Sequence, residues 1–184
     1  MTARRTALLM VAFAFLAAGC GSSRYTVIEP PKESVRDFKI LEIRDFSSNL
    51  QDEDSVRLAS QFADRLHKAV MEDRQEHPGE SIFEQVVRGN AATGDVLVLD
   101  GTIISFEKGS RAKRYFIGFG AGKAFCTIQS TFTNKTTGRE LLKTNFDGEL
   151  SMSFFGGSAD EAVDAVVDAY IDYLRDYFAT STAR

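Results

Sequence analysis

The strongest constraint on the fold is a strict alternation of side chains over residues 142–152. One set of alternate positions is small or apolar, and the other set from 143 to 149 is polar: Lys143, Asn145, Asp147 and Glu149. A period of two places successive side chains on opposite faces of a β-strand. We therefore predict a strand with one face against a core and the other in water, which is typical of an antiparallel sheet covered on one side.

Four further segments predict the remaining strands. They cover residues 38–43, 81–87, 95–107 and 125–133, and they are rich in branched and aromatic side chains. The segment 95–107 opens on a nearly continuous apolar run, which is typical of a central strand. Gly101 within it indicates a β-bulge. Turn-forming residues at 134–138 separate the last two strands.

Two helices are predicted, one after the first strand and one at the end of the chain. Acidic residues at 52–54 suit the positive end of a helix, and a one-sided apolar stripe follows up to Val70. The second helix begins at a capping box, Ser158–Glu161. The order β-α-β-β-β-β-α predicts an α+β fold, with an antiparallel sheet of about five strands and both helices packed on one face.

Residues 1–19 predict a signal peptide that is removed. Arg4 and Arg5 precede an apolar run over residues 7–18, which is shorter than the ~20 residues that cross a bilayer as a helix. The run ends in Leu-Ala-Ala-Gly-Cys at 16–20, which resembles the lipobox of bacterial lipoproteins. The resemblance implies that Cys20 carries lipid, palmitate included. Gly21 in place of Asp implies the outer membrane, facing the periplasm.

The mature chain divides into two parts in this interpretation. Residues 20–36 are mixed and polar with a Pro-Pro break, so we expect a lipidated N-terminus and a flexible tether that reaches on the order of 50 Å. Residues 37–180 predict a single α+β domain. Loss of Arg4 and Arg5 with the signal peptide takes the formal net charge from −4 to −6, which disfavours nucleic acid as a partner.

Cys126 is the other of the two cysteines. With Cys20 lipidated, it has no partner for an intramolecular disulfide. It alternates with Ala124, Ile128 and Phe132 on one face of the strand expected at 125–133. We interpret it as a small buried hydrophobic side chain and not as a reactive nucleophile.

The segment 108–123 is basic and rich in glycine. It holds five Lys and Arg residues and no acid, and three of its glycines alternate with larger side chains. Alternating glycines weaken a strand unless another surface approaches closely. With the aromatic loop after the last strand, this segment supplies the candidate interaction residues: Arg111, Lys113, Arg114, Tyr115, Phe116, Gly118, Phe119, Gly120, Gly122, Lys123, Phe154 and Phe155. If the strands meander, both loops lie at one end of the sheet, where an apolar patch would mark an interaction site.

Several of these residues resemble a family of bacterial lipoproteins described as domain of unknown function 4410. The resemblance rests on Gly101-Thr102-Ile103, on residues 106–111, 114–115 and 118–124, and on Phe155-Gly156-Gly157-Ser158. It covers most of the mature chain. It implies secretion and lipidation and brings no known activity.

Five interpretations of the glycine segment can be compared. A phosphate-binding P-loop fails because position 117 is Ile and position 124 is Ala, and a dinucleotide motif fails because a strand follows in place of a helix. A membrane-spanning hairpin could use residues 115–125, but 109–114 are too polar for its mate. The segment is then either a hairpin packed on its own sheet or a loop that binds a partner or lipid headgroups.

The last predicted helix carries an aspartate at every fourth position from Asp160 to Asp176. We interpret this row as a solvated outer face, with docking of the basic loop of a second copy as the alternative. One helix face cannot surround a calcium ion with oxygen ligands. His67 and His77 belong to no ligand set with metal spacing, and no serine-nucleophile motif is present. We predict no catalytic residue, no metal and no cofactor.

These observations predict a lipid-anchored cell-envelope protein with a non-enzymatic assembly or interaction role. Its partners are the membrane, through the N-terminal lipid, and a second copy or another envelope protein. One alternative is an accessory subunit of an export or pore-forming apparatus that oligomerises through its Gly-rich loops. The other is a periplasmic binder of a small molecule or glycan, which requires a cleft lined by Tyr and Phe.

Overall fold

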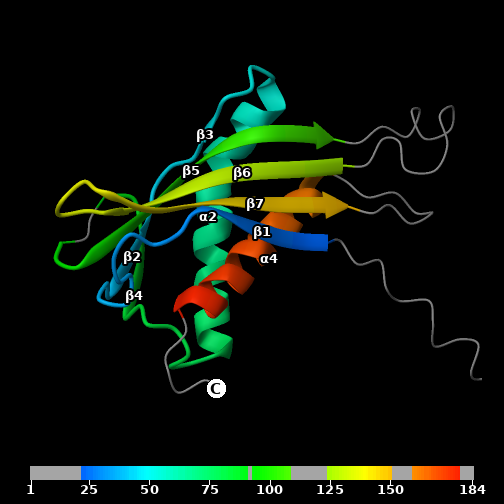
Figure 1. Cartoon of the computed structure of the whole chain (residues 1–184). Helices are drawn as coiled ribbons and strands as arrows, with labels where there is room; N and C mark the ends of the chain where they lie inside the picture. Colours follow the sequence, from blue (N-terminus) through cyan, green and yellow to red (C-terminus); the bar gives the residue numbers. More distant parts are fainter. Residues whose placement is uncertain (1–21, 91–92, 109–123, 151–158, 179–184) are drawn as a thin grey trace, which may run out of the picture.

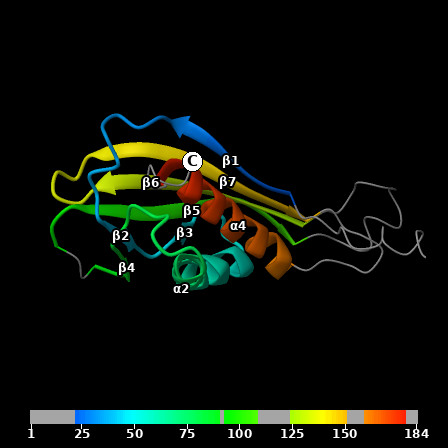
Figure 2. The same ribbon diagram turned by 90° about the horizontal axis from the view of Figure 1, so that it is seen from below.

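The computed structural model describes residues 22–90, 93–108, 124–150 and 159–178, which form a sheet with two helices against it (Figure 1). The strands are β1 (Ser22–Glu29), β2 (Ile40–Ile43), β3 (Ser47–Ser48), β4 (Gln85–Arg88), β5 (Val96–Lys108), β6 (Ala124–Asn134) and β7 (Glu140–Leu150). The helices are α2 (Glu53–Glu76) and α4 (Ala159–Phe178). The strand order is β1-β7-β6-β5-β2-β4, with β3 beside β5. Figure 2 shows both helices on the same face of the sheet.

The predicted α+β class with two helices on one face is confirmed, but the sheet is mixed and has seven strands. β5, β6, β7 and β1 are antiparallel neighbours, as expected. The prediction of a wholly antiparallel sheet is wrong at the other side, where β2 runs parallel to β4 and β5, and β3 runs parallel to β5. The reason is the crossover through α2, which returns the chain to the end where β2 started and makes β4 parallel to it.

Strand β1 occupies part of the segment that we expected to be a flexible tether. It pairs with β7 from Ser22 opposite Glu149 onwards, and Tyr25 and Val27 pack against the core. Beyond the strand, the Lys32 amide donates to the Leu141 carbonyl at 3.0 Å. The tether prediction is therefore wrong for residues 22–29. The strand was missed because only two of its side chains face the core and a Pro-Pro break follows it. An alternation this short does not identify a strand in the sequence.

Tyr25 also fastens β1 to helix α4. Its hydroxyl donates a hydrogen bond of 2.7 Å to the Asp176 carboxylate, and its ring lies 5.0 Å from the Tyr173 ring, centroid to centroid. The hydrogen bond to Asp176, then burial, raises the pKa of Tyr25 from 10.0 to about 12.

We predict that this contact stabilises the fold fully below about pH 10 and progressively less towards pH 12. Because the pKa of Tyr25 is higher in the folded chain than in the unfolded one, its contribution is fully present below pH 10 and is lost as pH rises towards 12. In urea unfolding, the wild type should be more stable than Tyr25→Phe at neutral pH, and the difference should shrink between about pH 10 and 12. A difference that does not change over this range would contradict the prediction.

The core lies between the sheet and the helices and is dominated by aromatic rings. Phe146 of β7 stacks on Tyr170 of α4 with a centroid distance of 3.6 Å, and Phe62 of α2 lies 5.6 Å from the same tyrosine. Thr144 and Phe146 are buried, which confirms the predicted inner face of β7. The apolar stripe of α2 is also buried, except that Ala69 is only partly covered.

Two glycines allow other groups to approach the sheet closely. A Cβ atom on Gly101 would lie 2.5 Å from Cε1 of Phe46, and one on Gly148 would lie 2.7 Å from Cγ2 of Val166 in α4. The bulge predicted at Gly101 is wrong, because the register shift of β5 falls between Ile103 and Ser105. Gly101 is needed instead to make room for the Phe46 ring.

Helix α2 begins where the acidic residues predicted. Asp52 is its N-cap and accepts a hydrogen bond of 2.9 Å from the Ser55 amide. That hydrogen bonding lowers the pKa of Asp52 below its ordinary value. The helix ends at Glu76, and the helix-breaking pair Pro78-Gly79 follows its C-cap His77. Neither α2 nor α4, within the described ranges, is long and apolar enough to span a membrane.

The other face of the sheet is mostly polar over β6 and β7 and bears cross-strand hydrogen bonds. Thr127 donates to Asp147 at 2.7 Å, and the Gln129 amide donates to Asn145 at 3.2 Å. These pairs confirm the predicted outer face of β7. On β2, the fully buried Glu42 accepts from Lys135 at 2.5 Å. This face is therefore held by polar contacts between neighbouring strands.

Candidate functional site

The strands β1, β5, β6 and β7 reach the same end of the sheet (Figure 1). Lys108 is opposite Ala124, Ala124 is opposite Leu150, and Ser22 is opposite Glu149. The connections 109–123 and 151–158 therefore both leave the sheet here, as the predicted meander requires. We call this the loop-bearing end. The chain also enters its first described strand here.

The candidate interaction residues themselves lie outside the described residues. They are Arg111, Lys113, Arg114, Tyr115, Phe116, Gly118, Phe119, Gly120, Gly122, Lys123, Phe154 and Phe155, together with the predicted lipidation site Cys20. What the structure places is the set of strand ends from which their segments start. Their role in binding remains a prediction.

The start of helix α2 lies at the loop-bearing end as well. The Asp54 carboxylate forms an ion pair with the Lys108 ammonium at the end of β5. The first turn of α2 also carries Glu53, and the N-cap is Asp52. The described residues thus give this end an acidic flank beside the last residue of β5.

The aspartate row lies on the outer face of α4. Asp164, Asp168, Asp172 and Asp176 are exposed, which confirms the predicted solvated face for these four, while nothing is described of the Asp160 side chain. Asp164 lies 3.8 Å from Arg65 of α2. Partial desolvation, followed by the charges of Asp172 and Asp164, raises the pKa of Asp168. Docking of a second copy on this row stays a prediction.

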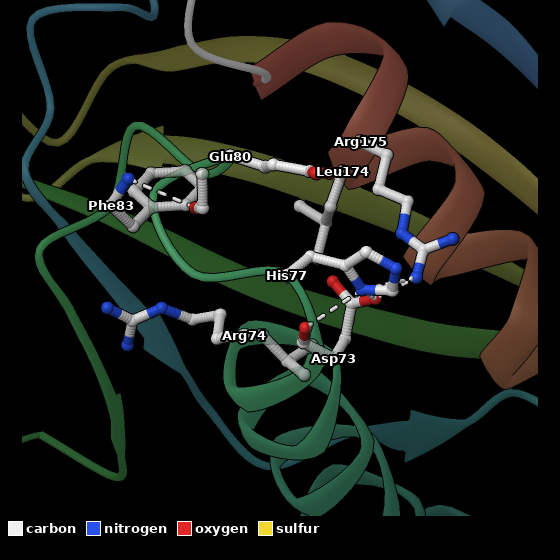
Figure 3. A pocket seen from close by; sticks show the side chains of 9 residues that line it. Asp73, Arg74, His77, Glu80, Phe83, Leu174 and Arg175 are labelled. Atoms are coloured by element: carbon white, nitrogen blue, oxygen red, sulfur yellow. Dashed lines mark hydrogen bonds and ion pairs between the residues drawn. The ribbon is translucent and has the colours of Figure 1, made fainter. Parts of the chain in front are cut away.

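A small cavity lies between the C-terminal turns of α2 and α4 (Figure 3). Its volume is about 190 Å³ and it is lined by Val70, Asp73, Arg74, His77, Glu80, Ser81, Phe83, Leu174 and Arg175. Pockets for drug-sized ligands measure roughly 300–1,000 Å³. The cavity is smaller than such pockets, and Phe83 is the one aromatic residue in its lining, whereas the binder alternative requires a cleft lined by several Tyr and Phe side chains.

The polar groups of this cavity are engaged with one another. Arg175 pairs with Asp73 and lies 3.0 Å from Nδ1 of His77. Arg74 donates to the Glu84 carbonyl at 3.0 Å, and Ser81 accepts from the Phe83 amide at 3.1 Å. The Arg175 contacts join the ends of α2 and α4. Sequence reasoning could not find them, because Asp73 and Arg175 are 102 positions apart.

A second hollow lies between β1 and α4 and is lined by Arg24, Tyr25, Asp172, Arg175 and Asp176. Tyr25 is already bonded to Asp176, and Arg175 to Asp73. Tyr25 is its one aromatic lining residue. Within the described part of the chain, no group of three or more His, Cys, Asp or Glu side chains could hold a metal ion.

Cys126 is buried in the core, with 1% of its surface exposed. Ala124, Ile128 and Phe132 are buried on the same face of β6, which confirms the prediction for this strand. Burial raises the pKa of the Cys126 thiol to about 12. The reactive thiolate is therefore scarce at neutral pH.

We expect Cys126 to resist alkylation as long as the chain is folded. Iodoacetamide should leave the thiol unmodified in buffer and modify it completely in urea, as measured by mass spectrometry of the peptide. The matched control is Thr137→Cys in the exposed β6–β7 turn, which should react at once without urea. Rapid modification of Cys126 in the folded wild type would show that β6 is accessible.

Comparison with known proteins finds one matching family and several solved structures with a similar fold. A family model described as domain of unknown function (DUF4410) matches residues 34–150. None of the curated proteins matches the chain. Among solved structures, a PelC dodecamer from Paraburkholderia phytofirmans is similar at 10% identity, with a TM-score of 0.53, over 85% of this chain and 98% of that chain.

A second crystal form, of a PelC variant from the same organism, is similar at 11% identity, with a TM-score of 0.52 and the same coverage. A protein from Xanthomonas campestris described as DUF330 is similar at 11% identity, with a TM-score of 0.51, over 82% of this chain and 90% of that chain. At these identities the likeness is one of fold.

Proposed function

The chain belongs to the DUF4410 family, and from this premise we propose that it is a lipid-anchored protein of the bacterial cell envelope with an assembly role, working as an oligomer of identical subunits. The lipid on Cys20 holds it to a membrane. The residues after the signal peptide favour the outer membrane, facing the periplasm. The role is one of interaction and needs no catalytic residue.

The observation that carries the proposal is the likeness to PelC. The PelC structures are dodecamers, and 98% of the PelC chain is covered by this chain. The similarity therefore includes nearly the whole of a subunit that assembles with copies of itself. A shared fold alone does not transfer an assembly, so the sequence features of this chain must support it independently.

Two features of this chain supply that support. The sheet ends in two edge strands, β1 of eight residues and β4 of four, whose outer backbone groups face no further strand among the described residues. Such edges are natural places for another chain to add. The exposed aspartates of α4 and the basic segment 109–123 also have opposite charge, which favours contact between neighbouring copies.

Sizing of the mature lipidated chain in detergent tests the oligomer. Light scattering should give a mass of several subunits, and high salt should reduce it, since exposed charges are screened. Phe119→Ser and Phe155→Ser should weaken the assembly, whereas Val56→Ser, which removes an exposed apolar side chain from α2, should leave it intact. A monomer at every concentration in low salt would refute the proposal.

Lipidation is tested separately. Mass spectrometry of the chain purified from membranes should find Cys20 at the new N-terminus, modified with several acyl chains. Cys20→Ser should accumulate as an unprocessed precursor. Normal processing and membrane retention of this variant would refute the anchor.

The same dodecameric likeness also favours a second candidate, an accessory subunit of an export or pore-forming apparatus. Such a subunit would be captured together with other envelope proteins after crosslinking in intact cells. A self-assembling protein without that role would be captured with copies of itself alone.

A further inference from the structure

We infer that the outer edge of strand β1, together with the hollow between β1 and α4, binds an extended basic segment of a partner protein, which adds to the sheet as one further strand. The inference goes beyond the proposed function, because it names a surface and a partner other than a second copy of this chain. It holds whether or not the copies assemble.

The first step is that β1 is the last strand on its side of the sheet (Figure 1). It pairs with β7 on one side only. The backbone groups of alternate residues point to opposite sides of a strand, so about half of the amides and carbonyls of β1 point away from β7. Among the described residues, no hydrogen bond from another segment satisfies these outward groups. A further strand would satisfy them.

The second step is that this edge is regular enough to pair. The register with β7 runs without a shift from Ser22 to Val27, and the irregularity follows only after Val27. Natural edge strands that avoid pairing are interrupted by prolines, lysines or bulges. Residues 22–27 contain neither proline nor lysine. The edge is therefore able to accept an extended chain.

The third step is the hollow that lies beside this edge, between β1 and α4. Its volume is about 530 Å³. Neighbouring strands lie about 4.8 Å apart, and every second side chain of a strand points to the same face of the sheet. Alternate side chains of an added strand would therefore stand over this hollow and face α4.

The fourth step is the charge of the hollow. Its two arginines are already paired with carboxylates, because Arg24 lies 3.8 Å from Glu149 and Arg175 pairs with Asp73. The two arginines therefore do not neutralise the aspartates that line the same hollow.

The aspartates Asp172 and Asp176 form no ion pair within the described part of the chain. Asp176 accepts the hydrogen bond of the neutral Tyr25 hydroxyl, and Asp172 is exposed. The two positions are one helical turn apart, which corresponds to about 6 Å along α4. Alternate side chains of a strand are about 6.7 Å apart. Lysine or arginine at alternate positions of the added strand therefore matches the two carboxylates in charge and in spacing.

A second copy does not supply such a strand from its described residues. The other edge strand of the sheet, β4, has four residues, whereas β1 has eight. Its arginine, Arg88, is engaged with Asp45 and Asp64 of its own chain. The occupant is therefore a different protein, with an extended segment in which basic side chains alternate with small or branched ones.

Peptides of about eight residues that alternate lysine with threonine or valine test the inference. Their binding to the mature lipidated chain in a neutral detergent is measured by fluorescence anisotropy. The lysine peptides should bind saturably at low salt, and their glutamate counterparts should not, since the aspartates of the hollow repel them.

Methylation of the peptide backbone shows whether the peptide binds as a strand. Methyl groups on every second backbone nitrogen remove the hydrogen-bond donors from one side of an extended peptide. Two peptides methylated in alternate frames therefore differ in which side is blocked. Binding should fall at least about tenfold in one frame and stay nearly unchanged in the other.

Asp172→Asn tests the role of the hollow, with Asp164→Asn on the same helix as its matched control. Both carboxylates are exposed and both variants lose one negative charge, but Asp164 does not line the hollow. Asp172→Asn should weaken binding of the lysine peptide about two- to fivefold. Asp164→Asn should leave it unchanged.

The outcomes separate the inference from the proposed function. Equal binding in both methylation frames would overturn strand addition, and equal effects of the two asparagine variants would overturn the role of the hollow. Absence of binding for every lysine peptide would overturn the inference, and disulfide-linked dimers of Thr26→Cys would then assign the edge to a second copy. A chain that binds the peptide but scatters light as a monomer would support the inference and refute the proposed function.

Discussion

Gly148→Val should be strongly destabilising, with a loss of about 3 kcal/mol or more in the free energy of unfolding. Gly148 lies on the inner face of β7, directly beneath α4. A Cβ atom there would collide with the Ala162 carbonyl oxygen and lie 2.7 Å from the Val166 amide nitrogen. Because both groups belong to the helix backbone, a change of rotamer cannot relieve the clash. The helix must move away from the sheet.

Urea unfolding of the purified domain measures this effect. Gly89→Ala is the matched control, because Gly89 has a φ of +88° but no atom within 4 Å of its Cβ position. It should lose about 1–2 kcal/mol from backbone strain alone. A Gly148→Val variant no less stable than Gly89→Ala would show that α4 does not sit as close to β7 as described.

Phe146→Ala should cost about 3–5 kcal/mol. The Phe146 side chain is fully buried and stacks on Tyr170 with an interplanar angle of 14°. It also meets Tyr173 edge-on, with a centroid distance of 5.3 Å. Its removal leaves a cavity between β7 and α4 that rigid rings on either side cannot fill.

The control for this prediction is Phe125→Ala on β6. Phe125 is half-buried and lies on the polar face of the sheet, away from the helices. The same change of side chain there should cost less than half as much, since a smaller apolar area returns to water. Equal losses for the two variants would contradict the assignment of the core to the helix-covered face.

Local patterns predicted most of the elements correctly. The alternation in β7 identified both of its faces, and the acidic N-cap located the start of α2. Each of these signals depends on residues within one element. The periodicity of a segment reports which face it buries, and that is a property that the segment carries by itself.

The errors concern relations between elements. The parallel pairing of β2 with β4 and β5 depends on the path of the chain through α2, and no single strand carries that information. Gly101 was interpreted as a bulge because a glycine in a strand has several explanations, and the ring of Phe46 that explains it is 55 positions away. The cavity between α2 and α4 was not predicted either, because the residues that line it are far apart in the sequence.

The sequence predicted where the two connections of the candidate site leave the sheet. Antiparallel pairing of β5, β6 and β7 is enough to bring two connections to one end of the sheet, and the register confirms this. What the sequence did not reveal is that the N-terminal segment arrives at the same end. That requires β1, whose inner face consists of Tyr25 and Val27 and whose neighbour in the sheet is more than a hundred positions distant.

The pairing of β1 with β7 also has a mechanical consequence. A force on the N-terminal end of β1 acts along the strand, and the backbone hydrogen bonds to β7 lie across that direction. These hydrogen bonds must therefore break together rather than one after another. Tyr25 and its bond to Asp176 add a fastening to a second element. A subunit pulled at its N-terminal segment would therefore lose β1 only when all the hydrogen bonds between β1 and β7 break.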